Sequence, residues 1–142
     1  PWRFIVLEQA ALRRLGVLAR NLAAAAGPEV VDADKASQQF ETGQLAVVVV
    51  ASPKPCDKFP QIEQTYSAGA VCLSLLNAAL ASGWGANWLS GWASHNREFC
   101  TEGLALAPHE HVAGIVHIGT GPAQIPDRPR PDVAAITQWI HE

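Results

Sequence analysis

The stretch AGAVCLSLLNAALASGWGANWLSGW, residues Ala68–Trp92, decides the fold of this chain. It begins as an apolar helix, turns at a Gly-Trp-Gly sequence and runs on into a second apolar segment. No Asp, Glu, Lys or Arg occurs between Glu63 and Arg97. In a globular chain, a helix that is apolar on nearly all sides is buried by the core or by a second subunit. We therefore predict a long central helix over Ile62–Ser82, then a short strand or extended loop.

The same stretch is about as long as a bilayer-spanning helix, but other features argue against a membrane span. Ser74 and Asn77 lie inside it, Gly83 and Gly85 end the helix early, and no cluster of Lys or Arg flanks it. The net charge of the whole chain is −3, so no basic field exists to attract a nucleic-acid backbone. We expect neither a membrane nor a nucleic acid as partner.

Cysteine usage indicates the compartment. The chain has three cysteines, Cys56, Cys72 and Cys100, which is an odd number without C-x-x-C spacing. A disulfide framework needs paired cysteines and an oxidising environment. We therefore expect free cysteines and a cytoplasmic location.

The remaining sequence predicts a small sheet with helices on both sides. Apolar runs predict strands over Arg3–Leu7, Leu45–Ser52 and His111–Gly119. Helical spacing and capping residues predict further helices over Gln9–Ala26, Ala33–Glu41, Asn96–Gly103 and Asp132–Trp139, the last of them after a Pro-rich arm over Thr120–Pro131.

The side chains show no reaction centre. His109 and His111 lie two residues apart, but the spacing supplies no third metal ligand, so we interpret them as solvated or core histidines. His117 lies on a predicted strand and is interpreted as a half-buried, hydrogen-bonded side chain. No serine stands in a G-x-S-x-G elbow. An enzyme with this sequence would need a cofactor to bring the chemistry.

One segment suits a planar cofactor. GWGANWLSGW concentrates Trp84, Trp88 and Trp92 with three glycines. Glycine lets a ligand approach the backbone closely, and extended backbone offers N–H and C=O groups to a heteroaromatic edge. A tight turn packed with core aromatics would use the same residues, and on residue types alone both interpretations remain open.

The order of these pieces resembles a known family. PWRFIVLE, VVVVAS, the helix-and-turn stretch quoted first, GLALAPHEHVAGIVHIGTGP and DRPRPD follow one another as in the FMN-dependent nitroreductases, close to the small single-domain bacterial members. The resemblance implies an α+β fold, a three-layer α/β/α sandwich with a small, mostly antiparallel central sheet. It also implies that residues 1–142 form one domain, that further helices precede Pro1, and that the arm 120–142 reaches over a second copy in a homodimer.

The resemblance assigns residues to the cofactors. Trp88, Leu89 and Ser90 match the segment that lines the isoalloxazine ring of FMN, where a backbone N–H faces N5. Arg128 or Arg130 matches a basic residue on the FMN phosphate. The segment assigned to NADH or NADPH comprises Ala78, Ala79, Leu80, Ala81, Ser82 and Gly83. We expect an open groove lined by Trp88–Ser90 near the subunit interface, and no metal.

The implied function is an NAD(P)H-dependent flavin oxidoreductase. NADH or NADPH would reduce FMN and leave, and a nitroaromatic or quinone-like acceptor would then be reduced in a second, ping-pong step. No side-chain acid or base is assigned to this reaction. The alternative is a non-catalytic dimeric protein of the same fold that binds flavin or another small ligand, and a dimeric structural domain without ligand is a third possibility.

Overall fold

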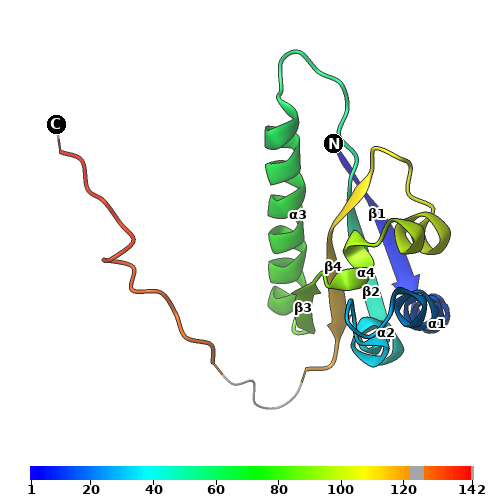
Figure 1. The fold of residues 1–142 in the computed structure, drawn as a ribbon. Coiled ribbons are helices and arrows are strands. Elements are labelled where there is room, and N and C mark those ends of the chain that lie inside the picture. The colour runs from blue at the N-terminus through cyan, green and yellow to red at the C-terminus, as the bar shows by residue number, and fades with distance from the viewer. Residues whose placement is uncertain (122–126, 142) are drawn as a thin grey trace.

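The computed structural model describes residues 1–121 and 127–141, and its centre is a four-stranded sheet (Figure 1). Every pair of neighbouring strands in this sheet is antiparallel, and the order is β1-β2-β4-β3. The strands are β1 (Trp2–Glu8), β2 (Leu45–Ala51), β3 (Gly85–Leu89) and β4 (His111–Gly119). The three strands predicted from apolar runs are confirmed, and GANWL is a strand rather than a loop.

Five helical segments connect and cover the strands. They are α1 (Gln9–Ala26), α2 (Ala33–Glu41), α3 (Gln61–Ala81), α4 (Trp92–His95) and the π-helical turn η1 (Phe99–Gly103). The predicted bounds of α1 and α2 are confirmed, and those of α3 shift by one residue. Asp32 caps α2, since its carboxylate accepts the backbone N–H groups of Asp34 and Lys35.

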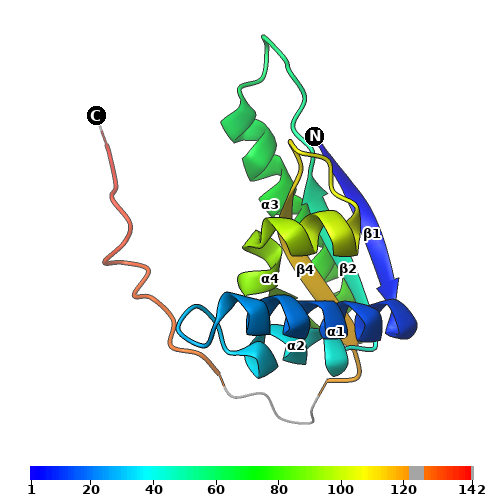
Figure 2. The same cartoon turned by 45° about the vertical axis from the view of Figure 1, so that its right-hand side comes forward.

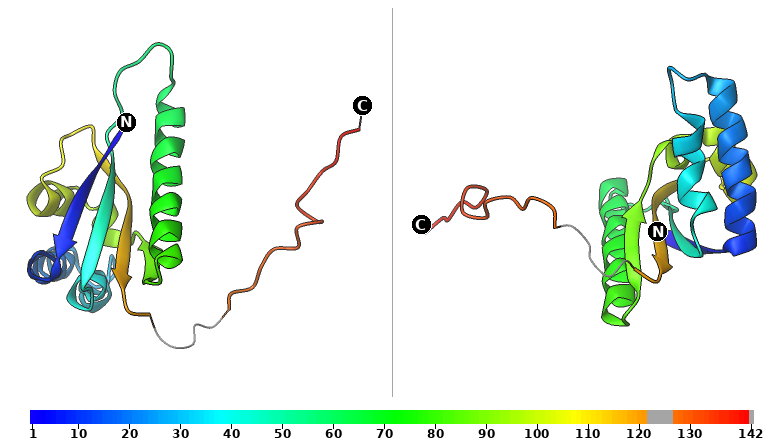
Figure 3. Two further views of the ribbon diagram at one scale, coloured as in Figure 1. Left: turned by 180° about the vertical axis from the view of Figure 1, so that it is seen from behind. Right: turned by 90° about the horizontal axis from the view of Figure 1, so that it is seen from below.

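The elements form three layers. Helix α3 lies against one face of the sheet, and α1, α2 and α4 lie on the other (Figures 2 and 3). This arrangement is the predicted α/β/α sandwich with a small antiparallel sheet. The central strand β2 is almost completely buried because it has a neighbour on each side and helices on both faces.

The main core lies between the sheet and α1, α2 and α4. Leu12 and Leu15 of α1 are fully buried there, as are Val48 and Ile115 of the two central strands. Phe40 of α2 meets the ring of Phe99 with a centroid separation of 5.2 Å. Helical spacing on α1 and α2 thus places one apolar stripe on each helix against the sheet.

Helix α3 buries only a narrow stripe within the chain. Gln64, Ala68, Cys72 and Ala79 are its buried residues, mostly small ones that let the helix lie close to the sheet. Large apolar side chains on its outer side stay exposed, namely Ile62, Tyr66, Leu73 and Leu80. The chain's own core therefore does not cover the helix that the sequence marks as apolar nearly all round.

The last two predicted helices have different outcomes. Asn96 caps a helical segment over 97–104, as predicted, since Oδ1 accepts the N–H of Phe99; its centre is the π-helical turn η1, and the unpredicted α4 precedes it. The helix predicted over Asp132–Trp139 is wrong, because only a turn forms at 133–136. Helices this short are marginal unless they bury a face, and this segment is exposed throughout. Part of the predicted arm, residues 122–126, lies outside the described residues.

Candidate functional site

The end of β3 places Trp88 and Leu89 on opposite faces of the sheet. Trp88 pairs with Val116 and Leu89 with Ile115, which belongs to the main core. Trp88 therefore lies on the α3 side, where its side chain is 38% exposed. A Cβ atom on Gly114 would collide with the Trp88 indole, so the ring lies directly on the β4 backbone.

The turn from β3 into α4 is exposed but held firmly. The carbonyl oxygen of Ser90 accepts two hydrogen bonds, one from Gln39 Nε2 at 3.0 Å and one from Ser94 Oγ at 3.1 Å. Gly91 follows with φ of 83°, in the left-handed region that favours glycine. The Ser90–Gly91 peptide is thus a rigid piece of backbone open to solvent.

The segment Ala78–Gly83 forms the last turn of α3 and its cap. Gly83 has φ of 85°, and the N–H of Trp84 donates to the carbonyl of Ala79 at 3.1 Å, which ends the helix. Ala79 is buried, whereas Ala78, Leu80, Ala81, Ser82 and Gly83 are exposed. Close packing within the chain therefore accounts for only one of these small residues.

A cavity of about 590 Å³ adjoins this helix end. Ala78, Ala79 and Ser82 line it together with Trp84 and the end of β4. A second cavity, of about 500 Å³, opens beside it on the α2 side and is lined by Asn87, His117, Thr120 and Arg128, among others. Neither cavity is lined by Trp88, Leu89 or Ser90, and the groove expected over those residues stays a prediction.

The two candidate phosphate ligands differ in their surroundings. Arg128 lines the second cavity, and Arg130 forms an exposed ion pair with Asp127 at 2.9 Å. A guanidinium that already has a carboxylate partner is less available to an anion. The geometry favours Arg128 over Arg130.

A family model described as "Nitroreductase family" matches residues 1–120. The chain belongs to the nitroreductase family. Two proteins named "Putative NAD(P)H nitroreductase YdjA", from Escherichia coli K12 and O157:H7, are each 31% identical to it over 120 residues. The match covers 84% of this chain and 65% of each relative, so the chain spans less than two thirds of the length of these relatives.

Solved structures of the family share the fold. A nitroreductase-like protein from Bacillus cereus superimposes with a TM-score of 0.72 at 21% identity, over 99% of this chain and 73% of that one. A Desulfovibrio desulfuricans protein, described as "a putative nitroreductase in complex with fmn", gives 0.68 at 20% identity, over 96% and 70%. These likenesses show that nearly the whole length of this chain has the nitroreductase fold.

His117 departs from its interpretation as a hydrogen-bonded side chain. It is half-buried on β4, as expected, but Nε2 is buried without a hydrogen-bond partner among the described residues. Burial lowers the pKa of this imidazole, because the charged form loses its hydration. His117 is therefore a neutral side chain beside the second cavity.

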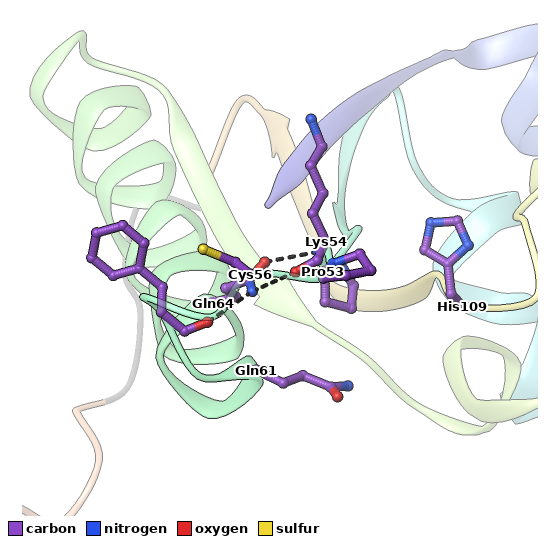
Figure 4. Close-up of a pocket in the computed structure, with 8 residues that line it drawn as sticks. Pro53, Lys54, Cys56, Gln61, Gln64 and His109 are labelled. Carbon is purple, nitrogen blue, oxygen red and sulfur yellow. Dashed lines mark hydrogen bonds between the residues drawn. The ribbon is translucent and has the colours of Figure 1, made fainter.

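Another cavity, of about 600 Å³, is lined by residues of the loop between β2 and α3, by the start of α3 and by His109, and by no residue of Ala78–Gly83 or Trp88–Ser90 (Figure 4). Figure 4 shows Cys56 and His109 separated by Pro53 and Lys54, so the thiol and the imidazole do not form a pair. The buried Gln64 uses both polar atoms on the backbone, accepting from Lys54 N and donating to the carbonyls of Lys54 and Phe59. This side chain closes the loop between β2 and α3.

Nowhere in 1–121 and 127–141 do three His, Cys, Asp or Glu side chains gather closely enough to hold a metal ion. No helix in that part of the chain combines the length and apolarity needed to cross a membrane. The three cysteines are free, and burial raises the pKa of Cys72 to about 11 and also raises that of Cys100.

Sequence reasoning missed the residues that support the turn. Gln39 stands in α2, 51 positions before Ser90, and a single glutamine in a helix carries no signal of so distant a contact. Ser94 is buried in the four-residue helix α4, which is too short to show a periodicity.

Proposed function

We propose that this protein is an FMN-dependent oxidoreductase, which passes electrons from NADH or NADPH through FMN to nitroaromatic or quinone-like acceptors in two half-reactions. The observation that carries the proposal is the match to the nitroreductase family over residues 1–120, a range that includes the firmly held Trp88–Gly91 turn. The free cysteines support a reducing compartment, and we infer the cytoplasm.

The turn fits a planar cofactor. Trp88, Ser90 and Gly91 are exposed, and no charged side chain stands between Trp88 and Gly91. The glycine leaves the peptide edge uncovered, and two hydrogen bonds hold that peptide before any ligand arrives. A rigid and accessible backbone edge can bind a heteroaromatic ring without first losing conformational entropy.

Each segment has a separate task in this proposal. The backbone of Trp88–Ser90 would bind the edge of the flavin ring, and Arg128 would neutralise the phosphate. The small exposed residues of Ala78–Gly83 would leave room for the nicotinamide nucleotide. When bound, FMN supplies the redox chemistry, accepting hydride at N5 and returning electrons to the acceptor. This chain's residues orient the cofactor and shield one side of it.

The proposed assembly is a homodimer. Groups of large apolar side chains are exposed on β1, on α3 and in the arm, and such groups mark an interaction surface. They are Trp2, Phe4 and Val6 on β1, Ile62, Tyr66, Leu73 and Leu80 on α3, and Val133, Ile136, Trp139 and Ile140 in the arm. A second copy would cover the outer side of α3, and its arm would bury apolar side chains that have no core of their own.

The direct test is a titration of the purified protein with FMN, followed by anaerobic addition of NADH or NADPH. Uptake of FMN and bleaching of its visible absorption are expected. FMN bound without bleaching would support the non-catalytic binding protein, and no uptake at micromolar FMN would contradict the proposal.

A pair of glycine variants locates the site. Gly91→Ala places a Cβ at φ of 83°, and Gly27→Ala does the same at φ of 94°, at the end of α1. Both should lose stability, on the order of 1–3 kcal/mol, because both place a side chain in a backbone conformation that is essentially limited to glycine. Only Gly91→Ala should weaken FMN binding, by about tenfold. Equal FMN affinity in the two variants would place the ring elsewhere.

A further inference from the structure

We infer that Gln39 is a positioning residue for the flavin site, one that holds the Ser90–Gly91 peptide in place from helix α2. The inference rests on the proposed function, because it concerns the same turn. Nothing in the family match or in the sequence pattern of α2 assigns a role to this side chain.

The geometry gives Gln39 a direct hold on the turn. Its Nε2 donates to the Ser90 carbonyl at 3.0 Å, and an added Cβ on Gly91 would lie only 3.3 Å from the same nitrogen. The side-chain amide therefore packs against this peptide as well as bonding to it. Ser94 Oγ donates to the same oxygen, so two side chains from different helices fix one carbonyl.

Fixing the carbonyl also fixes the amide on its other side. A trans peptide is planar, and its C=O and N–H point in opposite directions. Because the Ser90 carbonyl points toward Gln39 and Ser94, the Gly91 N–H points away from them. The structure thus presents the Gly91 N–H as a donor of set direction, supported from behind by α2.

Fold stability alone does not explain a glutamine at this position. Gln39 Oε1 is buried and has no hydrogen-bond partner among the described residues. A buried polar group without a partner is costly, and an apolar side chain of the same length would avoid that cost. A residue that costs stability yet positions an exposed peptide is typical of a functional site.

A fixed donor should distinguish the two redox states of a bound flavin. Reduced flavin is the more electron-rich state, so a pre-oriented N–H stabilises it more than the oxidised state. Loss of Gln39 should therefore weaken binding of both forms and weaken that of reduced FMN more. The midpoint potential of the bound cofactor should become more negative.

The test compares Gln39→Leu with Gln9→Leu in the full chain loaded with FMN. Gln9 Nε2 donates to Gln44 Oε1, so the control also removes a side-chain amide hydrogen bond. This bond does not involve the Ser90–Gly91 peptide. The measurements are FMN affinity by fluorescence titration, midpoint potential, and the urea midpoint of the flavin-free protein. Gln39→Met and Ser94→Ala serve as second variants if Gln39→Leu does not fold.

Gln39→Leu should keep or raise the urea midpoint while weakening FMN binding about tenfold. The ratio of affinities for oxidised and reduced FMN should change about five- to tenfold, which for a two-electron couple is about 20–30 mV. Ser94→Ala should shift the potential in the same direction, and Gln9→Leu should leave affinity and potential unchanged.

Other outcomes overturn the inference in distinguishable ways. If the wild-type protein binds no FMN, both the proposed function and the proposed role of Gln39 are wrong. If wild type and Gln39→Leu both bind FMN with the same affinity and midpoint potential, the proposed function stands and only the role of Gln39 is wrong. A drop in the urea midpoint with unchanged potential would make Gln39 a structural residue.

Discussion

The two faces of the sheet are covered in different ways. The face toward α1, α2 and α4 is filled with fully buried apolar side chains such as Leu12, Phe40 and Ile115. The face toward α3 has buried residues under the helix but leaves Phe4 on β1 and Leu73 on α3 exposed to solvent. Apolar residues are thus present on both faces, but only the first face is closed by the chain itself.

The difference separates folding from association. A side chain buried within one chain contributes to the stability of that chain, whereas an exposed apolar side chain gains only when a partner covers it. Substitutions on the α1 and α2 side should therefore change unfolding, and substitutions on the outer α3 side should change assembly. Matched pairs of variants can test this contrast directly.

The largest effect is expected from Phe40→Ala. Phe40 is fully buried against Phe99, so its truncation leaves a cavity and should cost about 3–5 kcal/mol of unfolding free energy. The matched variant Phe4→Ala removes a ring that is 48% exposed and should cost at most about 1 kcal/mol in the monomer. Urea denaturation at low protein concentration measures both. Similar losses for the two variants would contradict the contrast between the faces.

The next largest effect concerns association. Leu73→Asp introduces a carboxylate on the outer side of α3, where Leu73 is 51% exposed, and a second copy packed there would bury that charge without a partner. The dimer dissociation constant should rise at least about a hundredfold. Val17→Asp, on the exposed side of α1, is the control and should leave it unchanged. Sedimentation over a concentration series checks this, and equal association of both variants would exclude α3 as the interface.

The sequence predicted the sheet and its long helices because each carries a strong repeating pattern. Leu12, Leu15 and Leu18 recur at helical spacing, and the apolar run at Leu45–Ser52 is long enough to mark a central strand. Only α4 was missed among the helices of the sandwich, because four residues cannot display a helical period. The helix at Asp132–Trp139 was predicted from its cap alone, and a cap without a face to bury does not hold a helix.

The candidate site was predicted less completely than the fold. Family resemblance supplied Trp88–Ser90 and Ala78–Gly83, which are contiguous segments that a motif can mark. The supports of the turn come from elsewhere in the chain, since Gln39 reaches Ser90 across 51 positions and Ser94 lies in the following helix. Such a contact depends on how α2 packs against the sheet, which no local pattern encodes.

A smaller, pH-dependent effect is expected from Glu110→Gln. Glu110 is buried just before β4. Its carboxylate accepts hydrogen bonds from Arg3 Nε at 2.8 Å, from Arg3 Nη2 at 2.7 Å and from the N–H of Ala107. The hydrogen bonds from Arg3 are the main cause that lowers the pKa of this carboxyl from its ordinary 4.5 to about 2. Because the guanidinium is partly exposed, the variant should cost only about 1–2 kcal/mol at pH 7.

The sign of the pH dependence follows from the lowered pKa. The ionised carboxylate stabilises the folded protein above pH 4.5, and this contribution is lost as the pH falls toward 2. Wild type and Glu110→Gln should therefore converge in urea midpoint over that range. A constant difference down to pH 2 would mean that Glu110 acts through packing instead of charge.

The smallest effect compares one glycine in each outer layer. A Cβ on Gly16 of α1 would lie 2.9 Å from Glu41 Cγ, so Gly16→Ala must shift the Glu41 side chain, which pairs with Arg20, and this should offset the gain that alanine gives to a helix. A Cβ on Gly69 of α3 would meet nothing within 4 Å in this chain. Gly69→Ala should therefore stabilise the monomer by about 0.5–1 kcal/mol, since alanine favours helix.

The Gly69→Ala variant also tests whether a second copy packs against the outer side of α3. If a second copy lies close to this helix, the added methyl group that stabilises the monomer should weaken the dimer, because tight helix packing tolerates no extra volume. Unfolding at low concentration and sedimentation at high concentration should then change in opposite directions. A gain in both would show that the partner does not approach Gly69, and the interface would shift toward Leu73 and the end of the helix at Leu80.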